Sequence, residues 1–155
     1  METVFTLVPP PGKTSTALWV PAVLVLVSLA GILVVSKSLS GARSSTFTLS
    51  PAGLVIRGDL WGRTIPTAQL RGALARVVDL RVETALAPRR RTAGTGLPGY
   101  RSGWWRLANG EKALIYVTTT DRVVHVPTTA GYSLLLSVSE PERFAAQLRE
   151  LSPAG

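Results

Sequence analysis

Residues 17–35, ALWVPAVLVLVSLAGILVV, are the feature that most constrains what this chain can form. The run is nineteen residues long, carries no charge and has Ser28 as its single polar side chain. As a helix it would rise about 28 Å at ~1.5 Å per residue, close to the ~30 Å hydrocarbon core of a bilayer. Trp19 suits the aromatic belt of a membrane interface, and Pro21 falls in the first turn, where a missing N–H costs little. The run therefore predicts a single transmembrane helix.

Two other interpretations of this run stay open. A cleaved signal peptide would use Ser40-Gly41-Ala42 as its small-residue cleavage site. However, the run exceeds the ~7–15 apolar residues of a signal peptide, and Lys13 is the one basic residue before it. A buried core helix would need apolar partners on every side, which the rest of the chain could hardly supply together with its own core.

The flanking charges predict how the helix is oriented. Glu2 and Lys13 precede it, whereas Lys37, Arg43 and an arginine-rich region follow it. Positively charged flanks stay on the cytoplasmic side of a membrane. We therefore expect a single-pass protein of the cell membrane, with residues 1–16 as a short extracytoplasmic tail and the C-terminal domain in the cytoplasm.

Composition excludes several kinds of functional site. The 155 residues include no cysteine and one histidine, His125, which excludes disulfide scaffolds, thiolate zinc sites, cysteine nucleophiles and multi-histidine metal sites. The carboxylates are scattered, and no spacing places two of them on one face for acid–base work. We expect no catalytic residues, no metal and no cofactor.

After a short linker, residues 36–43, the pattern changes to short apolar segments separated by turns. The Pro51-Ala52-Gly53 turn between two apolar segments predicts a hairpin, and Asn109-Gly110 is the strongest short hairpin signal known. Residues 84–99, rich in Pro and Gly, are expected to form a loop. About seven strands are expected, and eight short segments are their candidates: 47–49, 54–56, 62–65, 75–82, 100–107, 112–118, 122–126 and 132–138.

The chain is expected to close with an amphipathic helix. Ser139-Glu140-Pro141-Glu142 has the form of a capping box, with Ser139 as N-cap and Glu142 three positions into the helix. Phe144, Leu148 and Leu151 then fall on one helical face. A helix of this kind must pack on an apolar surface.

Residues 97–148 resemble a family of small bacterial pleckstrin-homology (PH) domain proteins, and the 47–65 hairpin region also fits. The matching features are Gly99-Tyr100-Arg101, Gly103-Trp104, Asn109-Gly110, the strand at 112–118, Val126-Pro127, Leu135–Ser137 and the Pro141-Glu142 helix with Phe144. The resemblance implies a mainly β fold over 44–155, a PH-like, partly open seven-stranded barrel with one C-terminal α-helix, preceded here by a single transmembrane helix. It also implies that many members carry membrane helices, and it implies no settled activity.

Arg89-Arg90-Arg91 is the densest charge run in a chain of net charge +8. It is either a solvated loop or a contact for the phosphates of anionic lipid, and we predict that these three arginines bind lipid. PH relatives that bind phosphoinositides use basic residues in their first hairpin, where this chain has Pro51-Ala52-Gly53 with Arg57 beyond it. Nucleic acid is not an expected partner, because basic residues are spread along the chain.

The sequence thus predicts a membrane-tethered, non-enzymatic interaction module that binds a protein partner, the anionic membrane surface, or both. The alternative is a small-molecule sensor or an enzyme that uses the barrel mouth near His125. A polar pocket with converging ionisable groups around His125 would favour that alternative, and a filled apolar interior would favour the module. Of Trp104 and Trp105, adjacent in a strand, we expect one in the core and at most one facing outward.

Overall fold

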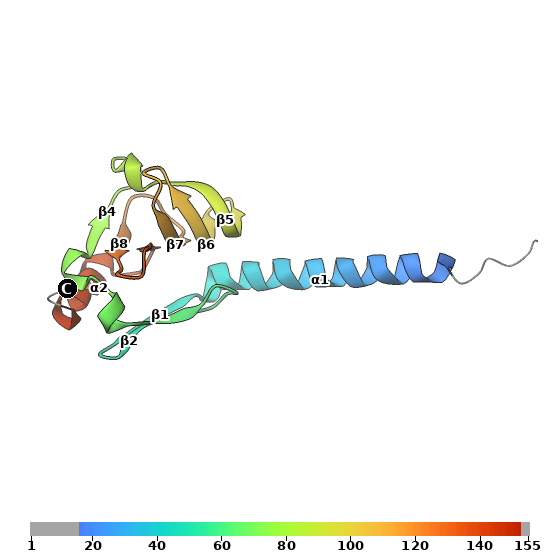
Figure 1. Ribbon diagram of the computed structural model, residues 1–155, viewed down its shortest axis with the longest axis horizontal. Coiled ribbons are helices and arrows are strands. Elements are labelled where there is room, and N and C mark those ends of the chain that lie inside the picture. Colours follow the sequence, from blue (N-terminus) through green and yellow to red (C-terminus); the bar gives the residue numbers. More distant parts are fainter. Residues whose placement is uncertain (1–15, 153–155) are drawn as a thin grey trace, which may run out of the picture. The chain divides into compact units, whose positions relative to one another are not determined.

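The computed structural model describes residues 16–152 (Figure 1), without the side chains of residues 16–18, 35 and 37–44. The expected extracytoplasmic tail therefore lies, apart from Thr16, outside the described residues. The chain divides into two compact units, Met1–Ser36 and Lys37–Gly155. Each unit is described by itself.

Helix α1 spans Thr16–Ser44, and so continues through the residues that were expected to form a linker. From Trp19 to Val34, every large apolar side chain is more than half exposed, with Trp19 at 71%. Within the part of the chain that the structure describes, no helix is both long enough and apolar enough to span a bilayer. The transmembrane helix over residues 17–35 stays a prediction from the sequence.

The second unit contains two β-sheets and a C-terminal helix. A three-stranded antiparallel sheet has the order β1-β2-β3, and a six-stranded sheet has the order β4-β8-β9-β7-β6-β5, in which only β7 and β9 run parallel. The bounds are β1 Thr46–Ser50, β2 Gly53–Arg57, β3 Arg63–Pro66, β4 Arg76–Val78, β5 Pro88–Leu97, β6 Tyr100–Leu107, β7 Lys112–Val117, β8 Val123–Pro127, β9 Ser133–Leu136 and α2 Pro141–Leu151. Short 3₁₀ turns lie at Thr67–Gln69, Gly72–Leu74 and Thr84–Leu86.

The structure confirms a mainly β fold with one C-terminal helix. The expectation of a seven-stranded barrel is wrong. The described residues form nine strands in two separate sheets, and the barrel is not closed. The prediction of a loop over residues 84–99 is wrong, because most of these residues form strand β5, which pairs with β6. Its glycines serve close strand packing: a Cβ at Gly94 would lie 2.1 Å from the carbonyl oxygen of Ser102.

The capping box expected at the start of α2 is also wrong. Glu140, not Ser139, occupies the N-cap position, and no side chain makes a capping hydrogen bond. Pro141 takes the first position of the helix, where its fixed φ fits and its missing N–H is not needed. The expected apolar face is present: Leu148 is fully buried, and Phe144 and Leu151 are half-buried.

The main core lies between the two sheets and under α2. Strand β7 shows how it is divided, since Leu114 and Tyr116 face this core while Ile115 and Val117 face a second, smaller core on the other side of the six-stranded sheet. Burial on both faces explains why the central strands read as continuous apolar runs rather than alternating ones. The buried members of the main core are Leu54, Ile56, Ile65, Leu70, Ala75, Leu114, Tyr116, Val124, Val126, Leu134, Leu136, Ala145 and Leu148.

Tyr116 and Asp59 join the two sheets. The hydroxyl of Tyr116, on β7, donates a 2.5 Å hydrogen bond to Oδ1 of Asp59, in the connection between β2 and β3. Asp59 Oδ1 also accepts from the backbone N–H of Trp61 at 2.9 Å, and Oδ2 accepts from the hydroxyl of Tyr100 at 3.3 Å. Burial and the neighbouring carboxylate both raise the pKa of Tyr116, so this phenol stays protonated and remains a donor.

We expect Tyr116→Phe to lower the free energy of unfolding by about 1–3 kcal/mol, because it removes the strongest partner of a partly buried carboxylate. Tyr132→Phe is the matched control: its ring packs edge-on against Trp104, with centroids 5.0 Å apart, and its hydroxyl has no partner among the described residues. That control should change stability by less than about 0.5 kcal/mol. Denaturant unfolding of the full chain, followed by tryptophan fluorescence, measures both. Equal losses in the two variants would contradict the role of the Tyr116–Asp59 bond.

Candidate functional site

The three arginines expected to bind lipid lie on a strand, not in a loop. Arg89, Arg90 and Arg91 belong to β5, an edge strand, and all three are exposed. The register with β6 breaks between Pro88 and Arg90 and again between Arg91 and Ala93. These two breaks are β-bulges, which bend an edge strand and change where its side chains point.

The neighbouring strand β6 adds Arg101 and Arg106, both exposed. We call β5, β6 and these five arginines the arginine hairpin. The ion pairs of the described residues lie elsewhere, between Arg76 and Glu83, Arg81 and Asp79, Arg122 and Glu142, and Arg143 and Glu140. The positive charge of the arginine hairpin is therefore not neutralised by a described acidic side chain.

The two tryptophans lie on opposite sides of their strand, as the sequence predicted, and neither is exposed. Trp104 and Trp105 are both half-buried, and they pack against the main and the second core respectively. Arg63 and Lys112 each stack on the ring of Trp104, at 4.6 and 4.2 Å from its centroid. Neither ring is a free stacking platform, because core side chains and cations already cover them.

His125 lies on β8, 8% exposed, with no hydrogen-bond partner for either ring nitrogen among the described residues. It lines a cavity of about 420 Å³ whose charged residues are Arg76 and Arg149. Two guanidinium groups cannot exchange protons with an imidazole near neutral pH, because they stay protonated. The converging acid–base groups that would favour an enzyme are therefore not found in the lining of this cavity. Among the described residues, no cluster of His, Asp or Glu could hold a metal ion.

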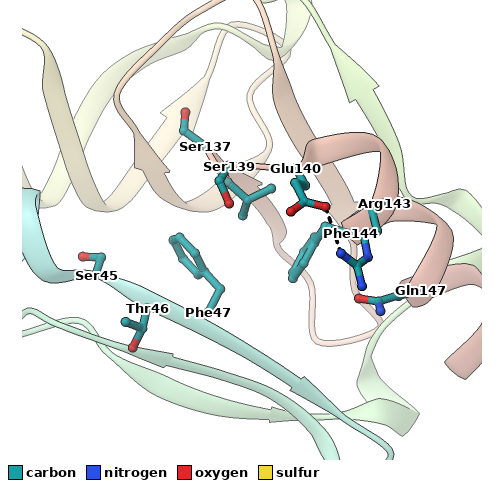
Figure 2. A pocket seen from close by; sticks show the side chains of 10 residues that line it. Ser45, Thr46, Phe47, Ser137, Ser139, Glu140, Arg143, Phe144 and Gln147 are labelled. Carbon is teal, nitrogen blue, oxygen red and sulfur yellow. Dashed lines mark hydrogen bonds and ion pairs between the residues drawn. The ribbon is translucent and has the colours of Figure 1, made fainter.

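Sequence reasoning missed a groove between β1 and α2 (Figure 2). A cavity of about 510 Å³ lies between the start of β1, residues 137–140 and the first turns of α2, with Phe47 and Phe144 pointing into it. A second cavity, of about 240 Å³, continues along the end of β1 and shares the lining residue Gln147. We call the two cavities together the β1–α2 groove.

The rim of the β1–α2 groove is mixed in charge. Glu140 and Arg143 form an ion pair at 3.1 Å on one side of the larger cavity (Figure 2). Glu150 lines the smaller cavity and has no ion-pair partner among the described residues. No local sequence pattern marks this groove, since its two walls are about one hundred residues apart in the chain.

Because His125 is buried, we expect the stability of the domain to depend on pH in a specific way. Burial lowers the pKa of His125 below its ordinary value of 6.5 and outweighs Glu111 and Glu83, which raise it, while Arg76 also lowers it. As the pH falls through the ordinary value, the unfolded chain takes up a proton that the folded chain does not. The free energy of unfolding should therefore fall between about pH 7.5 and about pH 5.5. In His125→Gln the free energy of unfolding should fall much less over this pH range, as measured by denaturant unfolding at each pH. The same dependence on pH in the parent and in the variant would contradict this account.

Comparisons with known proteins identify the domain. No curated protein and no solved structure matches the chain. A family of bacterial PH domains matches residues 45–152, which is more than half of the chain. The match begins directly before β1 and ends directly after α2, so it contains both sheets, the arginine hairpin and the β1–α2 groove. The chain therefore belongs to the bacterial PH domain family.

Proposed function

We propose that this chain is a membrane-attached, non-enzymatic interaction module that holds its PH domain against an anionic membrane surface. The observation that carries this proposal is the arginine hairpin. It presents five exposed arginines on two adjacent strands, none of them in an ion pair with a described acidic residue. Guanidinium groups suit this role because they pair with phosphate oxygens through fixed, parallel hydrogen bonds.

Attachment to the membrane is the part of the proposal that rests on residues 17–35. An uncharged run of this length suits a bilayer core, and the large apolar side chains from Trp19 to Val34 are exposed along α1. The flanking charges favour a single-pass orientation with the PH domain in the cytoplasm. There the domain would meet the leaflet that carries most of the anionic lipid.

The energetics give the arginine hairpin a limited role. Each arginine close to an anionic surface contributes about 1 kcal/mol, so Arg89, Arg90 and Arg91 together contribute about 3 kcal/mol and all five arginines of the hairpin about 5 kcal/mol at most. That is too little for stable recruitment of a soluble domain, but a covalently attached helix makes recruitment unnecessary. The hairpin would set how the domain lies against the bilayer.

The interior of the domain supports a module over an enzyme or a small-molecule sensor. The buried members of the main core are apolar side chains and Tyr116, whose hydroxyl is bound to Asp59. The cavity that His125 lines is open to solvent, and its charged lining residues are Arg76 and Arg149. A catalytic site at His125 would need an acid–base partner in the same pocket, and the lining of the cavity beside His125 offers none.

We expect the arginine hairpin to contact anionic lipid when the full chain is placed in lipid nanodiscs. Hydrogen–deuterium exchange in β5 should be slower in discs that contain phosphatidylglycerol than in discs of phosphatidylcholine alone. The difference should shrink as salt rises from about 0.1 M to about 1 M, because the Debye length falls from about 10 Å to about 3 Å. Replacing Arg89, Arg90 and Arg91 by glutamate should abolish the difference.

The charge-preserving control replaces the same three arginines by lysine, and most of the protection should remain. A second control, Arg57→Glu with Arg71→Glu, adds negative charge at exposed positions outside the hairpin and should leave the protection of β5 unchanged. Equal protection in the parent and in the triple glutamate variant would show that the arginines are only solvated, and would overturn the proposal.

A further inference from the structure

The four edge strands of the two sheets differ in how well they are protected against pairing with another strand. Edge strands usually avoid such pairing through charge, proline, bulges or shortness. Strand β5 carries three arginines and two bulges. Strand β3 has four residues, of which the first is Arg63 and the last is Pro66. Strand β4 has three residues and begins with Arg76, which is ion-paired to Glu83.

Strand β1 has none of these protections. Its sequence, Thr-Phe-Thr-Leu-Ser, contains no charge and no proline, and it pairs with β2 over all five residues without a break in register. On an edge strand, every second residue directs its backbone N–H and C=O away from the sheet. Strand β1 therefore offers a row of backbone donors and acceptors on a side where no described strand pairs with it.

The β1–α2 groove lies along this same strand. Its larger cavity is lined by Thr46 and Phe47 from the start of β1, and its smaller cavity by Leu49 and Ser50 from the end. Five extended residues cover about 17 Å at ~3.3 Å per residue, the length of an ordinary strand. The free edge and the groove together have the form of a site for one added strand.

The side chains of the groove restrict what that strand can be. Phe47 and Phe144 point into the larger cavity, so an incoming strand would place apolar side chains there (Figure 2). The charged residues beside them, Glu140 and Arg143, neutralise each other. At the other end, Glu150 carries an unpaired negative charge among the described residues, which favours a basic residue on the occupant.

We propose that the β1–α2 groove binds an extended segment of a partner protein, which adds to the free edge of β1 as a fourth strand of the three-stranded sheet. The segment carries apolar side chains at alternate positions and a lysine or arginine beside Glu150. This site deepens the proposed role as an interaction module by naming a class of partner. It does not depend on lipid contact, because it lies on the other sheet from the arginine hairpin.

The test uses the full chain, isotope-labelled in detergent micelles, and a capped peptide of alternating threonine and valine that ends in lysine. Titration should shift the backbone amide signals of β1 and of Gln147, with saturation. The amide signals of β5 should not move. Absence of shifts in β1 at millimolar peptide, or shifts confined to β5, would overturn the proposal.

Two substitutions on the exposed side of α2 separate blocking of the groove from damage to the helix. Gln147 lines both cavities, so Gln147→Trp should weaken binding at least tenfold. Ala146, its exposed neighbour, lines none of the cavities described, so Ala146→Trp should bind the peptide like the parent. Equal effects of the two tryptophans would overturn the assignment of the groove.

A charge exchange tests the preference for a basic residue. Glu150→Arg should weaken binding of the lysine-ended peptide and strengthen binding of the same peptide ending in glutamate, while Thr64→Lys should do neither. Thr64 is the right control because it lies on β3 in the same cross-strand row as Thr48, at the opposite edge of the sheet. If Glu150→Arg changes neither affinity, or if β1 shifts with protein concentration alone because two copies pair, the proposed occupant is wrong.

Discussion

The hydrogen bond between Tyr116 and Asp59 is the interaction on which the arrangement of this domain depends. Tyr116 is the largest fully buried side chain, and it belongs to the centre of the six-stranded sheet. Its hydroxyl reaches the β2–β3 connection of the other sheet, and its ring packs edge-on against Phe47 of β1, with centroids 5.8 Å apart. One side chain thus contacts the three-stranded sheet at two places, the β2–β3 connection through its hydroxyl and, through its ring, the Phe47 ring that points into the β1–α2 groove.

The division into two sheets has a direct consequence for function. A closed barrel would have no edges, whereas two open sheets leave four edge strands. Strand β5 carries arginines without ion-pair partners, which is a surface suited to phosphate. Strand β1 carries no charge and lies beside a groove, which is a surface suited to another strand. The two surfaces belong to different sheets, so the two proposed contacts do not compete for the same strand.

Local signals predicted the elements of the fold better than their arrangement. The Asn109-Gly110 turn marked β6 and β7, and the Pro51-Ala52-Gly53 turn marked β1 and β2, because such turns depend on a few adjacent residues. Strand β5 was missed because proline and glycine are typical of loops, and the close approach of Ser102 that requires a glycine at position 94 exists only once β5 has paired with β6. The parallel pairing of β7 with β9 has no local signal at all.

The candidate sites show the same limit. The arginine run was visible in the sequence, but its place on an edge strand beside Arg101 and Arg106 was not. The β1–α2 groove could not be predicted, because Phe47 and Phe144 meet only after both sheets and α2 have packed. The sequence named His125 only as the place of an alternative site, and its position beside Arg76 and Arg149 depends on the pairing of β4 with β8 and on the packing of α2.

We propose that the arginine hairpin faces the membrane while β1 stays open to a partner in water. The chain has no cysteine, so a single spin label can be placed at Ala93→Cys on β5 or at Thr48→Cys on β1, both exposed positions. Collision of each label with lipid-soluble oxygen and with a water-soluble nickel complex, in nanodiscs containing phosphatidylglycerol, measures its depth directly. We predict that the label at position 93 lies at the headgroups and the label at position 48 lies in water. A label at position 48 as deep as the label at position 93, or deeper, would contradict the account.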